Sequence, residues 1–91
     1  MTAINLKVAH SMRMNKLVLL DSAFGKALKK RRQFRNLTQE TISLECGLSR
    51  SYISELELGK KDPSLFTIFK LAQALKIKPS VLLDEVEHSL E

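Results

Sequence analysis

Arg50 has the most specific chemistry open to any residue of this sequence, and Glu55, Lys60 and Lys61 follow it closely. An arginine guanidinium can donate hydrogen bonds to both O6 and N7 of guanine, a pair of acceptors that no other base presents in the major groove of DNA. Lysines neutralise phosphates, whereas a glutamate is repelled by them and would accept from cytosine N4 or orient the arginine. These residue types suit the recognition of duplex DNA, although Arg50 and Glu55 could also be an ordinary exposed pair.

The remaining residues offer no group suited to catalysis or metal binding. The sequence has no pair of carboxylates, cluster of metal ligands or glycine-rich phosphate loop, so neither an enzyme nor a cofactor nor a metal site is expected. His10 has no Cys or carboxylate cluster nearby, and both His10 and His88 are predicted to be surface histidines rather than ligands. Cys46, the single cysteine, is predicted to be a small buried hydrophobe, and the lack of a disulfide suits a reducing compartment.

The spacing of apolar residues predicts a helix-turn-helix over residues 39–58, which positions these side chains. Residues 39–45 suit a short helix and residues 50–57 a second, recognition helix, which lies in the major groove in such motifs. Gly47 supplies the positive φ needed at the break, and Ser49 caps the recognition helix. The outward-facing residues would be Arg50, Ser51, Tyr52, Ser54 and Glu55.

Three further helices are predicted around this motif, so the fold class is all-α. The first begins at a cap formed by Asp21 or Ser22 and runs to about Arg35. A fourth helix follows a cap at Ser64, and a fifth begins near Pro79, a residue that suits the first turn.

Two parts of the chain are distinguished by their patterns. Residues 1–20 lack a clear period and are predicted to be an N-terminal arm or extension, whereas residues 21–88 form one helix-turn-helix domain. Apolar residues alternate from Ile4 to Val8 as in a strand, while residues 17–20 could extend the first helix backwards. The arm is either loosely ordered or packed on a partner subunit.

Positive charge is concentrated in the first two thirds of the chain. Residues 1–61 carry twelve Lys or Arg and five Asp or Glu, a net charge of +7, whereas residues 62–91 carry three and five, a net charge of −2. Such an imbalance favours a polyanionic partner, and no segment pairs a basic face with the broad apolar face that a membrane surface requires. No apolar run is long enough for a membrane span or a signal peptide, so we expect a cytoplasmic protein.

Arg32 is predicted to need an ion-pair partner inside the fold. It lies near the apolar stripe of the first helix, where an unpaired charge would be costly. Glu57, at the end of the recognition helix, is the candidate. Thr38 is predicted to cap the helix that precedes the turn.

An ordered series of short motifs runs from Phe24 to Leu83. It consists of Leu37-Thr38-Gln39-Glu40, Gly47-Leu48-Ser49, Tyr52-Ile53-Ser54, Glu57 with Gly59-Lys60, Pro63-Ser64-Leu65, and Leu71-Ala72 with Ala74-Leu75. In this order and spacing the series resembles the Cro/repressor-type (Xre) helix-turn-helix family of transcriptional regulators. The run from Arg50 to Ser54 is also similar to the controller proteins of restriction–modification systems.

The resemblance implies a five-helix, lambda-repressor-like bundle that binds double-stranded DNA as a two-fold homodimer. It implies that Gln39 contacts a phosphate and braces the recognition helix, and that Arg32 and Glu57 form the internal ion pair of the family. Tyr52 would contact a phosphate or a thymine methyl group, and Lys60 and Lys61 would contact phosphates. Base edges would be faced by Arg50, Ser51 and Glu55. The candidate DNA-binding residues are Thr38, Gln39, Ser49, Arg50, Ser51, Tyr52, Glu55, Lys60 and Lys61.

The sequence departs from the family pattern at three positions. Ser43 stands where alanine is usual, so its hydroxyl must find a partner; Arg31 replaces a residue that is often apolar; and Leu58 replaces one that is usually polar. Exposed apolar surface is therefore expected at Leu58, Phe34, Phe66 and Phe69. It is either minor mispacking, a subunit interface or a surface that the N-terminal arm covers.

A homodimer on a near-palindromic operator is expected, because one recognition helix contacts too few base pairs to find a genomic site. The end of the fourth helix and the fifth helix are the candidate interface, through Ile77, Val81, Leu82 and Val86. Two alternatives remain open. One is the antitoxin and autorepressor of a toxin–antitoxin pair, with a partner protein; the other is an interaction domain that no longer binds DNA.

Overall fold

The computed structural model describes residues 17–91, which form five α-helices and no strand. The helices are α2 (Leu20–Phe34), α3 (Gln39–Cys46), α4 (Arg50–Glu57), α5 (Leu65–Ala74) and α6 (Pro79–Ser89). The all-α class is therefore confirmed. The predicted arm lies largely outside the described residues, as do the alternating residues Ile4 to Val8 and His10.

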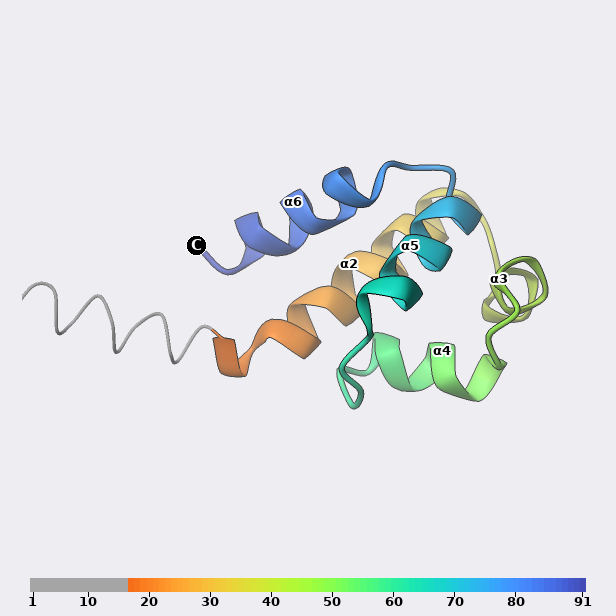
Figure 1. Ribbon diagram of the computed structural model, residues 1–91, viewed down its shortest axis with the longest axis horizontal. Coiled ribbons are helices and arrows are strands. Elements are labelled where there is room, and N and C mark those ends of the chain that lie inside the picture. Colours follow the sequence, from red (N-terminus) through yellow and green to blue (C-terminus); the bar gives the residue numbers. More distant parts are fainter. Residues whose placement is uncertain (1–16) are drawn as a thin grey trace, which may run out of the picture.

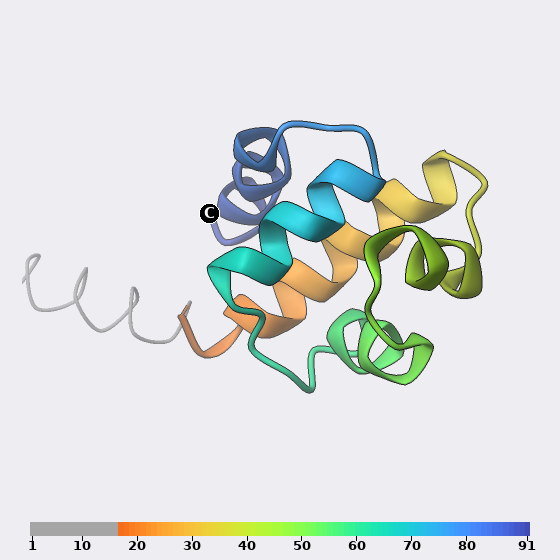
Figure 2. The same ribbon diagram turned by 45° about the vertical axis from the view of Figure 1, so that its right-hand side comes forward.

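Helix α2 runs through the middle of the bundle, with α4 packed on one side and α6 on the other (Figures 1 and 2). Helix α3 packs against α4 and α5, and α5 packs against α6. The core contains one or more fully buried side chains from every helix: Leu28, Ile42, Ile53, Leu56, Leu71, Leu75 and Leu82. The bundle thereby holds the inner side of α4 and leaves its other side at the surface.

Three of the predicted helix caps are present. The side chains of Thr38, Ser49 and Ser64 each accept a hydrogen bond from the backbone N–H three residues later, at 3.0, 3.1 and 3.1 Å. Each bond satisfies one of the free amides of a helix start. The short helices on either side of the turn therefore begin where local side-chain chemistry places them.

The predicted cap of the first helix is wrong, and the alternative, that the apolar residues before it extend this helix backwards, is confirmed at Leu20. Neither Asp21 nor Ser22 caps it, because α2 already begins at Leu20, with Leu19 as a cap that makes no side-chain hydrogen bond. The carbonyl of Leu19 accepts from the N–H of Ala23 at 2.8 Å, so the apolar run before the expected cap continues the helix. Asp21 instead lies in the first turn, where its charge complements the helix dipole.

Gly25 and Gly47 each allow a backbone arrangement that a side chain would prevent. A Cβ on Gly25 would lie 2.3 Å from the carbonyl oxygen of Leu56, so α2 crosses the end of α4 in backbone contact. Gly47 has φ of +73° and ends α3 in the left-handed conformation, as predicted from the sequence. Gly25 thus allows the end of α4 to lie close to α2, and Gly47 allows the chain to turn from α3 towards α4.

Replacing Gly47 with alanine should lower the free energy of unfolding by about 1–2 kcal/mol, because an L side chain is strained at positive φ. A Cβ there would meet only the Lys70 Nζ, at 3.8 Å, so crowding adds nothing to the cost. Urea-induced unfolding measures the loss. Gly47→Asn is the matched control and should lose less, since asparagine tolerates this conformation; equal losses in both variants would contradict the backbone explanation.

Candidate nucleic-acid interface

Helix α4 presents one polar face to solvent and buries the opposite one. Arg50 and Ser51 are exposed, Ser54 and Glu55 are half-buried, and the other side of the helix, formed by Ile53, Leu56 and Glu57, is buried. An open hollow over the polar face is lined by Gln39, Arg50, Ser51, Ser54, Glu55, Leu58 and Lys60. The structure thus brings together most of the residues predicted to contact DNA.

Tyr52 is placed differently from the prediction. It was expected to point outward with its neighbours, but it is half-buried and packs against the core. The reason is its position one residue before the fully buried Ile53, on the flank of α4 that faces the bundle. Tyr52 therefore supports the recognition helix from the side of the core.

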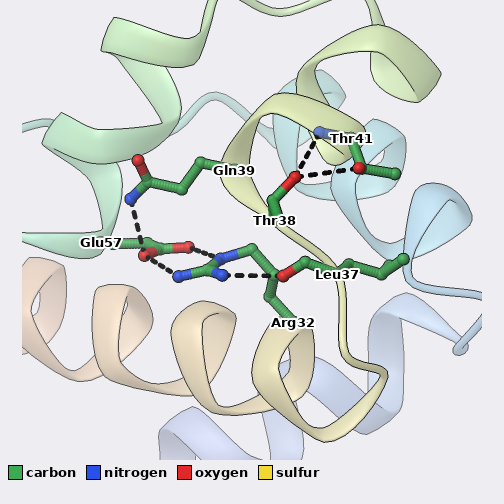
Figure 3. A network of polar contacts seen from close by, with 6 residues as sticks. All are labelled: Arg32, Leu37, Thr38, Gln39, Thr41 and Glu57. Carbon is green, nitrogen blue, oxygen red and sulfur yellow. Dashed lines mark hydrogen bonds and ion pairs between the residues drawn. The ribbon is translucent and has the colours of Figure 1, made fainter.

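A buried polar network holds the far end of α4 (Figure 3). The Arg32 Nε and Nη2 donate to the two carboxylate oxygens of Glu57 at 2.6 and 2.9 Å, and the Arg32 Nη1 donates to the Leu37 carbonyl at 2.8 Å. The Glu57 side chain is only 3% exposed and that of Arg32 11%. The bidentate hydrogen bonds to Glu57 raise the pKa of Arg32 above its ordinary value, so the guanidinium stays charged. The predicted ion pair is confirmed.

Gln39 joins this network from the first turn of α3. Its Nε2 donates to a carboxylate oxygen of Glu57 at 3.0 Å (Figure 3). A side-chain amide nitrogen has two N–H donors, so one can hold Glu57 while the other remains for an acceptor such as a phosphate oxygen. Gln39 therefore braces α4, as predicted, and borders the hollow at the same time.

The starts of α3 and α4 border a second open hollow, next to the first. Its lining includes Thr38, Gln39 and Arg50, with Arg32, Asn36, Leu37 and Glu40. Arg50 lines both hollows, at the first position of the recognition helix. The free amides and the positive dipole end of a helix favour anions, so this edge suits a DNA phosphate. Ser49 and Thr38 serve here as caps, which orient those amides.

The loop after α4 carries two exposed lysines. The Lys60 N–H donates to the Glu55 carbonyl at 2.9 Å, which folds the loop back along the recognition helix. The Lys61 Nζ lies 3.9 Å from a Glu55 carboxylate oxygen, and both side chains are about half exposed. Such a pair contributes little to stability. Within residues 17–91 the ion-pair partner of Glu55 is therefore Lys61, not Arg50.

Comparison with known proteins decides the family. Residues 28–82 match the family model described as "Helix-turn-helix". The chain belongs to this family, whose members are transcriptional regulators of the Cro/repressor type. It is a helix-turn-helix, DNA-binding transcriptional regulator and not an enzyme.

Several relatives of this helix-turn-helix regulator are controller proteins. It is 40% identical over 62 residues to the control protein C.BamHI of Bacillus amyloliquefaciens, across 67% of this chain and 76% of that protein. It matches the crystal structure of the restriction–modification controller protein C.AhdI from Aeromonas hydrophila with 42% identity and a TM-score of 0.67, covering 68% of this chain and 94% of that one. The likeness to controller proteins is thereby confirmed.

A further structure shares the fold. The controller protein C.Esp1396I, solved as a tetramer with its natural 35 base-pair operator, matches with a TM-score of 0.73 and 22% identity, over 78% of this chain and 93% of that chain. At this identity the match shows the helix-turn-helix fold alone.

The departures from the family pattern have local explanations in this regulator. The Ser43 hydroxyl donates to the Leu48 carbonyl across the turn, which supplies the partner that the sequence required. Arg31 pairs with Glu85 of α6, a contact that sequence analysis missed. Its only indication was that both residues carry opposite charge beside an apolar stripe.

The exposed apolar side chains lie where the sequence placed them. Phe34, Leu58, Phe66 and Phe69 are 79, 65, 71 and 53% exposed. Cys46 is buried in the core, and His88 is exposed, as predicted. Among residues 17–91 there is no group of side chains that could hold a metal ion, and no helix that is long and apolar enough to cross a membrane.

Four residues were predicted to carry apolar surface that the core does not need, and for two of them this prediction is wrong. Leu82 is fully buried and Val86 is 3% exposed, because α6 uses both to cover α2 and α5. Ile77 is half-buried against the core, and Val81 keeps 38% of its surface exposed. Of these four residues, only Val81 and part of Ile77 could therefore contact a partner.

Proposed function

We propose that this regulator binds a specific, near-palindromic operator as a homodimer, in the manner of a restriction–modification controller protein. The observation that carries the proposal is the polar face of α4, where Arg50, Ser51 and Glu55 border one hollow with Gln39 and Lys60. Arg50, Ser51 and Glu55 suit base edges, and Gln39 and Lys60 suit phosphates, so one surface offers both kinds of contact.

The energetic design favours a rigid recognition helix. Glu57 fixes the end of α4 to Arg32 of α2 and to Gln39 of α3, so three helices share one buried carboxylate. A helix held in this way pays little conformational entropy when it enters the groove. Through Gln39, the same network links a residue suited to a phosphate contact to the helix that carries the residues suited to base contacts.

Dimerisation would supply the length of sequence that one helix lacks. Two copies would place their recognition helices about 34–36 Å apart, one turn of DNA. Val81 and Ile77 remain candidates for the contact, and the exposed aromatic side chains Phe66 and Phe69 of α5 add apolar surface on the helix that packs beside α6. The end of α6 is a poor candidate, because its exposed Asp84 and Glu87 and the terminal Glu91 would face like charges across a two-fold axis.

Selection of bound sequences from a random duplex pool tests the proposal. The expected product is a near-palindrome with half-sites one helical turn apart, bound by two chains as measured by sedimentation on the selected duplex. A failure to enrich any sequence, or a single chain on the enriched duplex at tens of micromolar, would rule out the proposed operator complex.

Lys60→Ala and Lys61→Ala should each weaken binding to the selected and to random duplexes by a similar factor. Each lost phosphate contact should make the negative slope of log K against log salt concentration shallower by about 0.9. Anisotropy titrations between low and physiological salt measure both effects. Lys30→Ala is the matched control, since this exposed lysine lines the opposite, α6 side of α2; an equal change of slope in the control would remove the assignment of the loop.

A further inference from the structure

Leu58 places an apolar side chain on the polar, DNA-facing side of α4. It follows the last residue of the helix, and its N–H still donates to the Ser54 carbonyl at 3.0 Å, so the helical path continues through it. Residues three, four and seven positions apart share one face of a helix, which puts Leu58 in line with Ser51, Ser54 and Glu55. Its side chain is 65% exposed and lines the same hollow as these residues.

The position of Leu58 separates it from the other exposed hydrophobic residues. Among the large exposed apolar side chains of residues 17–91, it is the one that lines the hollow shared by Arg50 and Lys60. Phe66 and Phe69 lie on α5, and Leu44 lies on α3. The Leu58 side chain would therefore contact a ligand bound in this hollow, and the basic residues Lys60 and Lys61 follow it in the loop.

We propose that Leu58 contacts the 5-methyl group of a thymine in the operator and so specifies that base. The inference rests on the proposed operator binding by α4. In the major groove, thymine alone presents a methyl group, beside its O4 acceptor, whereas the other three bases are recognised there by hydrogen-bond donors and acceptors alone. A leucine packed against a donor or acceptor would remove its bound water and offer no replacement. Leucine therefore favours thymine and disfavours the other three bases.

The distance between Leu58 and Arg50 limits where the thymine can lie. Eight residues of α-helix span about 12 Å. One turn of DNA spans about 34–36 Å in 10–10.5 base pairs, so this distance corresponds to roughly three or four base pairs. The thymine should consequently lie within about four base pairs of the guanine bound by Arg50, on the side nearer the centre of a two-fold site if the loops of two copies face each other.

Deoxyuridine substitution tests this contact, because deoxyuridine pairs as thymine does but lacks the methyl group. Each thymine of the duplex selected from the random pool is replaced in turn, and affinities are measured for the full-length chain, for Leu58→Ala and for Leu44→Ala. We expect one thymine per half-site at which the substitution weakens wild-type binding roughly four-fold, the effect of losing one buried methyl group. For Leu58→Ala, the same deoxyuridine substitution should cause no loss of affinity. For Leu44→Ala, it should weaken binding by the same factor as for the wild type.

Each other outcome decides against the contact in a recognisable way. If Leu58→Ala retains the wild-type loss at every thymine, or if no thymine is sensitive, the contact does not exist although operator binding stands. If Leu58→Ala instead weakens self-association in sedimentation measurements without DNA, the residue belongs to a subunit contact. If no duplex is enriched from the pool, the proposed function fails, and this inference fails with it.

Discussion

Glu57→Ala should lower the free energy of unfolding by about 3–5 kcal/mol, the cost of removing one partner from a buried ion pair. The substitution would leave the Arg32 guanidinium charged in a site where its side chain is only 11% exposed. It would also remove the acceptor of the Gln39 Nε2. Urea-induced unfolding followed by circular dichroism measures the change, and the recognition helix should lose its fixed position together with the stability.

Glu55→Ala provides the matched control for this prediction. It removes the same residue type from the same helix, but Glu55 is part exposed and its only ion-pair partner among residues 17–91 is Lys61, at 3.9 Å. A loss below about 1 kcal/mol is expected there. The double variant Arg32→Met with Glu57→Leu should be more stable than Glu57→Ala, since no buried charge remains unpaired. Equal and small losses for Glu55→Ala and Glu57→Ala would show that the network contributes little.

The features that sequence analysis predicted correctly are mostly local. The caps at Thr38, Ser49 and Ser64 and the left-handed Gly47 each depend on a few consecutive residues. A side-chain oxygen that can reach an amide three residues later, or a glycine at a helix end, acts in the same way in any fold. The pairing of Arg32 with Glu57 joins distant residues, and it was predictable only because a charge beside an apolar stripe must be neutralised.

The errors concern which neighbour covers an apolar surface. Leu82 and Val86 lie on the apolar stripe of α6. Such a stripe indicates which side of a helix is buried, but it does not indicate whether the same chain or a partner covers that side. The central position of α2, between α4 and α6, decides the matter. The pairing of Arg31 with Glu85 belongs to the same packing, and it could not be predicted without it. The early start of α2 is a smaller case, in which apolar residues continued a helix through the expected cap.

Arg50→Ala should weaken binding to the selected operator by about 1–3 kcal/mol and relax the preference for one base pair in each half-site. The physical reason is the loss of two parallel hydrogen bonds to a guanine edge. The affinity of the variant for random duplexes should fall less, because only the contribution of one positive charge is lost there. Titrations of the variant against the operator, against each substituted half-site and against random DNA measure these losses separately.

Arg50→Lys separates the charge from the geometry. Lysine keeps the positive charge but has a single flexible ammonium group, so affinity for random DNA should be retained while much of the discrimination at that base pair is lost. If Arg50→Ala weakens operator and random DNA equally, Arg50 contacts only phosphate. Within residues 17–91 the guanidinium has no ion-pair partner to give up, it is exposed, and it stands in the first turn of α4 between the two hollows. A guanidinium placed in this way can reach a base edge without first breaking a contact of its own, which is why its removal should cost more than that of any other exposed residue on the recognition helix.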